Sequence, residues 1–168
     1  LETLLSGEGT VEVKDGRIVD VNILKLVLSK LSFIPNLAEQ VENNLSDEYK
    51  EKLKKRDTIL EKVKADVRIR NGVLEINRAE LNADGFLVVA NGELNLDQNL
   101  LLKADFYIPS DLSASMVASV QELGYLLDEN KQIHVPFKPY EGKLANFRMY
   151  PDVEDVGKEI IRSRGKEE

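Results

Sequence analysis

Apolar and polar residues alternate along much of the chain, and Asn-Gly or Asp-Gly steps interrupt the alternating segments. Alternation with a period of two places the apolar side chains on one face of a β-strand. Both residues of such a step tolerate the positive φ angles of a two-residue type I′ turn. The pattern therefore predicts an antiparallel sheet built from hairpins, with turns at Asp15-Gly16, Asn71-Gly72, Asp84-Gly85 and Asn91-Gly92.

The steps at Asn71-Gly72 and Asn91-Gly92 predict a definite register, because facing residues lie at equal distances from the turn. Around Asn71-Gly72 the facing pairs are Ile69 with Leu74, Val67 with Ile76, Arg68 with Glu75, and Asp66 with Asn77. Around Asn91-Gly92 they are Val89 with Leu94, Leu87 with Leu96, Val88 with Asn95, and Phe86 with Asp97. Both hairpins then have one apolar and one more polar face. The pairing fits only in part at Asp15-Gly16 and Asp84-Gly85, where we expect a bulge or a bend.

The remaining segments complete an α+β fold, in which a curved, mainly antiparallel β-sheet of hairpins has helices packed on one face. We expect the whole chain, 1–168, to form one domain. The predicted extended segments are a first hairpin over 10–22, strands over 60–70, 73–82, 86–96, 100–108 and 132–136, a turn at Glu141-Gly142, and a strand over 145–149. The predicted helical segments are an insertion over 23–58, a helix over 110–128, and a terminal helix over 152–163 whose end frays from Arg162.

Two residues mark where the first helical segment begins and where it ends or kinks. Asn22 is placed to cap the first helix, and Pro35 ends or kinks it. A second helix follows, with Leu37, Val41 and Leu45 on one face. Met116 lies in the apolar stripe of the 110–128 helix, where we expect a core residue and not a ligand.

Composition excludes several classes of function. The 168 residues carry a formal net charge of −7, so a surface that follows nucleic-acid phosphates is not expected. Cysteine is absent, which removes thiolate catalysis and cysteine-based metal centres. His134 is the sole histidine, and in a predicted strand it is better explained as a structural residue than as a metal ligand. We therefore expect no metal and no cofactor.

No catalytic motif stands in the context that its chemistry requires. Gly7-x-Gly9 lacks a third glycine and precedes a strand instead of following one. Ser163 to Lys166 matches Ser-x-x-Lys only in the charged tail. The carboxylates of Asp152, Glu154 and Asp155 lie at a predicted helix N-terminus, which favours stabilisation by the helix dipole over a divalent-cation site. These observations predict a protein that is not an enzyme and has no catalytic residues.

Several motifs in succession resemble the C-terminal region of AsmA-like proteins, which are relatives of TamB. The segments that carry this resemblance are Gly7-Glu8-Gly9, Asp15 to Ile18, Val67 to Leu74, Val89 to Leu96, Ile133 to Phe137, Gly142-Lys143-Leu144 and Pro151-Asp152. The resemblance covers nearly the whole chain. It implies a periplasmic domain of an inner-membrane-anchored protein that acts in outer-membrane homeostasis, in a family thought to carry phospholipid along a β-sheet groove. The abrupt start at Leu1 and the charged end predict an excerpt of a longer chain, at its membrane-distal end.

Two hypotheses from different classes follow. The first is a lipid-binding module in which acyl chains lie on the apolar sheet face, whose predicted residues are Val67, Ile69, Leu74, Ile76, Leu87, Val89, Leu94 and Leu96. The second is a structural or interaction domain, in which helices seal the sheet and exposed strand edges pair with the remaining repeats of the parent chain or with envelope partners. In either case the first hairpin is expected at an open sheet edge, through which the isolated domain could form a homodimer. The sequence alone does not choose between them.

Overall fold

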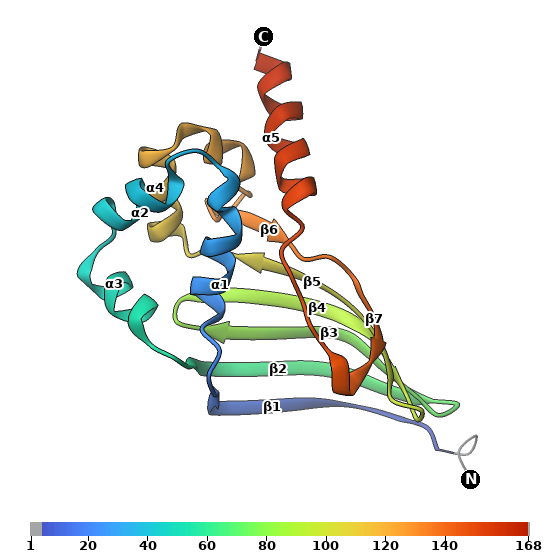
Figure 1. The fold of residues 1–168 in the computed structure, drawn as a ribbon. Coiled ribbons are helices and arrows are strands. Elements are labelled where there is room, and N and C mark those ends of the chain that lie inside the picture. Colours follow the sequence, from blue (N-terminus) through green and yellow to red (C-terminus); the bar gives the residue numbers. More distant parts are fainter. Residues whose placement is uncertain (1–4, 168) are drawn as a thin grey trace.

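The computed structural model describes residues 5–167, which form a curved, open antiparallel sheet with helices beside it (Figure 1). The predicted α+β class is confirmed. The strands are β1 (Gly7–Ile18), β2 (Thr58–Arg70), β3 (Val73–Ala83), β4 (Phe86–Asn95), β5 (Asn99–Tyr107), β6 (His134–Pro136) and β7 (Tyr140–Lys143). The α-helices are α1 (Ile23–Lys30), α2 (Leu37–Asn44), α3 (Asp47–Lys54), α4 (Ser110–Ser119) and α5 (Val153–Glu167), and the short 3₁₀ helices are η2 (Leu31–Phe33), η3 (Gln121–Leu126) and η4 (Leu144–Asn146).

The two long edges of the sheet differ. The strand order is β1-β2-β3-β4-β5-β6, and β7 pairs with the other end of β5. The outer side of β5 is thus covered by β6 over 105–107 and by β7 over 99–102. Among residues 5–167, β1 pairs only with β2, so its other side is a free edge. The expectation of an open edge at the first strand is confirmed.

Two of the four predicted turns are confirmed. Asn71 and Gly72 have φ angles of 53° and 74°, and Asp84 and Gly85 have φ angles of 48° and 87°, as a type I′ turn requires. The expected bulge lies in β3 between Ile76 and Ala79, where the register to both neighbouring strands shifts by one residue. This extra residue corrects one predicted pair, because Asp66 faces Arg78 and not Asn77.

The predicted hairpin over 10–22 is wrong, because β1 continues through Asp15-Gly16. The extended backbone of β1 is interrupted only at Asp15, which has a φ angle of 56°. Beyond Ile18 the chain turns toward α1 and is held by Thr58, whose hydroxyl donates to the Val21 carbonyl (2.7 Å) and accepts from the Ile23 N–H (3.0 Å). These two bonds hold the segment after Ile18 as a connection to α1, so this segment does not fold back as a second strand. β1 pairs with β2 instead.

The predicted hairpin at Asn91-Gly92 is also wrong, because both residues lie inside β4. Gly92 does not have a positive φ angle. Its role is to allow close approach, since a Cβ atom at this position would collide with the Leu101 carbonyl of β5. The chain reverses later, where the Gln98 N–H donates to the Asn95 carbonyl at 3.0 Å and Gln98 adopts a φ angle of 62°.

The start of the helical insertion is confirmed, since the Asn22 side chain caps α1 by accepting from the Lys25 N–H at 2.9 Å. Pro35 follows the end of η2, as expected. The predicted helix over 110–128 is broken at Val120, where the backbone is extended between α4 and η3. Its stripe still lies in the core, and Met116 is buried as predicted.

Three expectations near the C-terminus are corrected. Glu141-Gly142 lies inside β7 and forms no turn, because these residues pair with Leu100 and Leu101 of β5. The strand predicted over 145–149 is absent from the described residues, and η4 with an irregular segment takes its place. The terminal helix α5 continues past Arg162, where fraying was expected, to Glu167, and its Ile161 side chain is 74% exposed.

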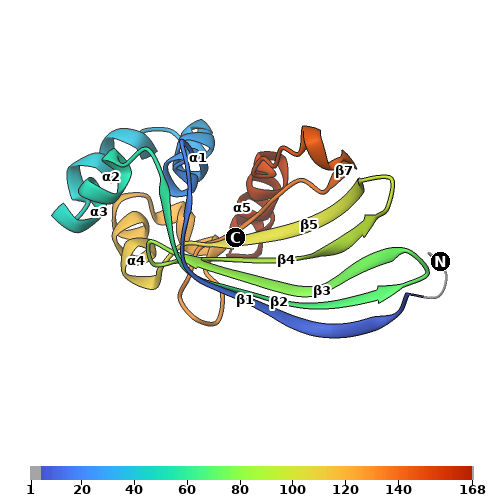
Figure 2. The same cartoon turned by 90° about the horizontal axis from the view of Figure 1, so that it is seen from below.

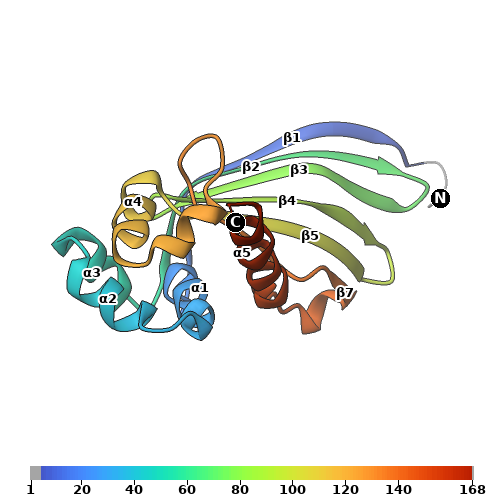
Figure 3. The same ribbon diagram turned by 90° about the horizontal axis from the view of Figure 1, so that it is seen from above.

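The hydrophobic core lies at one end of the sheet, under the helices. Phe86 and Phe106 stack with ring centroids 4.8 Å apart, and Leu24, Val27 and Met116 pack in the same buried cluster. Figures 2 and 3 show that the helices stand on the side toward which the sheet bends. The helices therefore cover only part of the concave side, which leaves the other end of the sheet with less cover.

Candidate functional site

The side chains on the helix-bearing face of the sheet, here called the concave face, are almost all apolar. Facing residues in an antiparallel register project to the same side, so the buried Phe86 and Phe106 identify this face on every strand. Away from the helices the concave face contains Leu100 of β5, which faces Leu94 and is buried. Its other side chains are not fully buried, and they are those of Val11, Val13, Val63, Ala65, Val67, Ile69, Leu74, Ile76, Leu94 and Leu102.

Five of the eight predicted binding residues come together on the concave face: Val67, Ile69, Leu74, Ile76 and Leu94. Leu74 of β3 faces both Ile69 of β2 and Leu94 of β4, so the apolar row crosses three strands. These side chains are half-buried. They form a continuous apolar surface at the end of the sheet away from the helices.

The other three predicted residues do not belong to this surface. Leu87 and Val89 lie on the opposite, convex face, where they pair with Tyr107 and Asp105 of β5. Leu96 follows the end of β4 and is 60% exposed in the connection to β5. The cause is the misplaced turn, because without a reversal at Asn91-Gly92 the residues before and after it keep opposite orientations.

Residues of β1 belong to the concave face but were not predicted there. Val11 faces Ala65 and Val13 faces Val63, and the two valines are 54% and 47% exposed. Their alternation with Glu12 was visible in the sequence. The false turn at Asp15-Gly16 concealed it, because it paired this segment with residues 17–20 and not with β2.

The convex face is charged and carries ion pairs between neighbouring strands. Arg70 pairs with Glu75 at 2.8 Å, and Arg68 pairs with Glu8 of β1 at 3.3 Å. Arg68 and Glu75 face each other as predicted, but each forms its ion pair with a different residue. Exposed pairs of this kind contribute about 0–1 kcal/mol each, so their main effect is to keep this face polar.

His134 lies on the convex face beside Asp105, with 2.7 Å between Nε2 and Oδ1. Its ring stacks on Tyr107, with centroids 5.0 Å apart. Partial burial, followed by the charge of Asp105, raises the pKa of the Tyr107 hydroxyl. Residues 5–167 contain no group of three or more His, Asp or Glu side chains that could hold a metal ion. The pair is placed to join β5 to β6, as expected of a structural histidine.

Of the three acidic residues Asp152, Glu154 and Asp155 at the start of α5, Asp152 caps the helix. The Asp152 carboxylate accepts from the Asp155 N–H at 3.1 Å, which is the bond of an N-cap.

None of the helices formed by residues 5–167 combines the length and the apolar character that a membrane-spanning helix needs. No protein-family model, curated protein or solved structure matches this chain.

Proposed function

We propose that this domain binds acyl chains of phospholipid, or conducts them, along the concave face of its sheet. The observation that supports the proposal is the row of half-buried apolar side chains that continues across β2, β3 and β4 beyond the cover of the helices. Hydrocarbon needs no directional bond, and each 100 Å² of apolar surface removed from water contributes about 2.5 kcal/mol. An uncovered apolar sheet face has the chemistry that such a ligand requires.

The biological setting of the proposal comes from the resemblance to the C-terminal region of AsmA-like proteins. It would place the domain in the periplasm, in an inner-membrane-anchored protein that serves outer-membrane homeostasis without enzymatic activity. Val67 to Leu74, one of the segments that carry the resemblance, also contributes three of the five side chains on the apolar row. A general esterase or phosphatase signal that disappears in His134→Ala or Asp152→Ala would contradict the non-enzymatic proposal.

The test uses matched variants on the two faces of one sheet. Purified protein is analysed by native mass spectrometry for co-purifying lipid and by uptake of a phospholipid with one fluorescent acyl chain. Val67→Asp and Ile76→Asp place a carboxylate on the concave face and should reduce uptake at least fivefold. Val89→Asp makes the same change at a half-buried position of the convex face and should leave uptake unchanged. Equal loss in all three variants, or no loss in any, would contradict binding on the concave face.

A second candidate function has its own observation. The free edge of β1 runs along 12 residues with unpaired backbone groups, and its concave side bears two exposed valines. Such an edge is suited to pairing with a neighbouring repeat or another envelope protein. A clean lipid-free mass together with no phospholipid uptake would favour this interaction domain over the lipid-binding one.

A further inference from the structure

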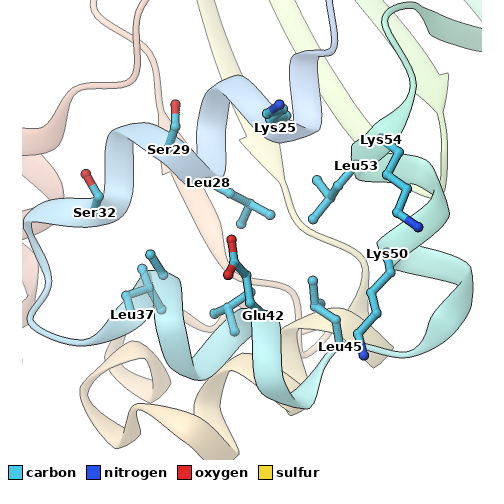
Figure 4. A pocket seen from close by; sticks show the side chains of 12 residues that line it. Lys25, Leu28, Ser29, Ser32, Leu37, Glu42, Leu45, Lys50, Leu53 and Lys54 are labelled. Carbon is cyan, nitrogen blue, oxygen red and sulfur yellow. The ribbon is translucent and has the colours of Figure 1, made fainter.

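A separate pocket lies within the helical part, among α1, η2, α2 and α3 (Figure 4). Its volume is about 490 Å³, within the range of small-molecule sites. No strand residue lines it, so it is distinct from the concave face of the sheet. The side chains of the helical part therefore determine what this pocket can bind.

The floor of the pocket is apolar because three helices direct leucine or valine side chains into the same space. Leu37, Val41 and Leu45 recur every four residues along α2, which places them on one side of that helix. Leu28 of α1 and Leu53 of α3 approach from the other two helices, as Figure 4 shows. Leu37, Val41 and Leu45 belong to the same buried core cluster as Leu24 and Val27 of α1, and Leu28 and Leu53 are partly buried against it. The floor of the pocket is therefore the outer side of the core.

The rim of the pocket is basic. Lys25, Lys50 and Lys54 line it, together with the hydroxyls of Ser29 and Ser32. One carboxylate, that of Glu42, points from α2 toward Leu28 inside the pocket (Figure 4). Lys54 is paired with Glu51 at 2.9 Å. Lys25, Lys50 and Glu42 form no ion pair with any residue in the range 5–167. With Lys54 neutralised by Glu51, two unpaired cations and one unpaired anion leave the pocket a small excess of positive charge in a chain of net charge −7.

We propose that this pocket binds the anion of a long-chain fatty acid. The apolar floor would hold the chain, and its carboxylate would meet Lys25 or Lys50, which stand on opposite sides of the pocket (Figure 4) and are not paired with an acid. A methylene group takes up roughly 30 Å³, about the volume of a water molecule in the liquid, so the pocket holds on the order of 16 such groups. That volume fits one acyl chain and not a whole diacyl lipid. The site depends on its own side chains and does not require lipid binding by the sheet.

The experiment measures displacement of cis-parinaric acid, a fluorescent fatty acid, from the 168-residue chain. Dodecanoate should displace the probe at least tenfold better than dodecanol, which has the same chain without the charge. Lengthening the competitor from decanoate to dodecanoate should improve displacement, by up to roughly fourfold for each buried methylene. Dodecanol that competes as well as dodecanoate would overturn the assignment of the lysines.

Charge-reversal variants then locate the site. Lys25→Glu combined with Lys50→Glu changes only exposed residues and should weaken dodecanoate at least tenfold with little effect on dodecanol. Lys64→Glu combined with Lys158→Glu makes the same change in net charge outside the pocket, and binding should be retained. Equal losses in the two double variants would indicate a general charge effect and overturn the proposal.

A floor variant and a sheet variant separate this pocket from the concave face. Leu28→Asp should weaken both competitors, whereas Val67→Asp should leave fatty-acid binding intact. If Val67→Asp loses fatty-acid binding while Leu28→Asp retains it, the fatty acid binds on the sheet, and the proposed site in the pocket is refuted. If Leu28→Asp does not fold by circular dichroism, the exposed lysine variants still decide the outcome.

Discussion

Gly72 and Gly92 both favour glycine, for different physical reasons. Gly72 has a φ angle of 74° in a type I′ turn, and a Cβ atom there would meet only the flexible end of Leu96 at 3.2 Å. Gly92 has no positive φ angle, but a Cβ atom there would meet the β5 backbone. A side chain such as Leu96 can move aside, whereas a paired strand cannot.

Substitutions by alanine and asparagine should separate these reasons. Gly72→Ala should cost about 1–2 kcal/mol for the left-handed conformation, and Gly72→Asn should cost less than about 1 kcal/mol, because asparagine tolerates it. At Gly92 both substitutions should cost more than about 3 kcal/mol through steric overlap. Urea denaturation measures these differences. A Gly92→Asn variant as stable as Gly72→Asn would contradict the close approach of β4 and β5.

Thr58 joins the start of β2 to the connection before α1 and is 1% exposed. Replacing it by valine keeps its shape but leaves the Val21 carbonyl and the Ile23 N–H without this partner, which should cost about 1–3 kcal/mol. Thr58→Ser keeps the hydroxyl and should lose about 1 kcal/mol or less for one methyl group. Chemical denaturation of both variants provides the comparison, and a valine variant more stable than the serine variant would show that these two bonds do not stabilise the fold.

At the scale of elements, the ends of β2, β3, β4 and β5 could be predicted within a few residues, because the alternating pattern is local. The face of the sheet to which their side chains project could not be predicted for every strand. A turn placed at Asn91-Gly92 instead of after Asn95 reverses the orientation assigned to the residues on one side of it, which is why Leu87 and Val89 were placed with Leu94. An Asn-Gly step permits a turn but does not require one when a neighbouring backbone needs the glycine.

Helices α3 and α4 are linked by one polar contact with a pH-dependent contribution. The Tyr49 hydroxyl donates to the Asp111 carboxylate at 2.6 Å. This bond lowers the pKa of Asp111, while burial and then the bond to Asp111 raise the pKa of Tyr49 well above its usual range. The lowered pKa gives stability that is present above the ordinary carboxyl range and is lost as pH falls through the folded pKa. The raised pKa gives stability that is present below the ordinary tyrosine range near 10 and is lost as pH rises toward the folded pKa.

Removing the hydroxyl should therefore flatten the stability profile at both extremes of pH. Tyr49→Phe should lower the free energy of unfolding by about 1–2 kcal/mol at pH 7, and by less near pH 3. It should also remove the part of the expected loss of stability above pH 10 that comes from Tyr49, whereas the part from Tyr107, whose pKa is also raised, should remain. Thermal or urea unfolding across this pH range provides the measurement. A difference between parent and variant that stays constant from pH 3 to pH 7 would show that Asp111 has no part in it.

At the scale of the whole molecule, the sequence predicted the fold class and an open first edge, but not how the two edges differ. Covering β5 with β6 and β7 depends on contacts between segments that are distant in the chain, such as Tyr107 with His134 and Leu102 with Tyr140. The basic pocket among α1, α2 and α3 was missed for a similar reason. Its lysines belong to two helices, and only the packing of these helices places Lys25, Lys50 and Lys54 around one pocket.

The free edge of β1 predicts self-association of the isolated chain. Antiparallel pairing of two β1 strands would satisfy unpaired backbone groups and bring Val11 and Val13 of each copy into one continuous concave face. Sedimentation should detect a concentration-dependent dimer, and Val11→Lys combined with Val13→Lys should weaken it at least tenfold, because like charges would meet across the new pair. Val19→Lys combined with Val21→Lys is the matched control, since both valines are exposed and lie just beyond β1. A parent chain that stays monomeric at every concentration measured, or a control variant that dissociates the dimer equally, would exclude pairing through this edge.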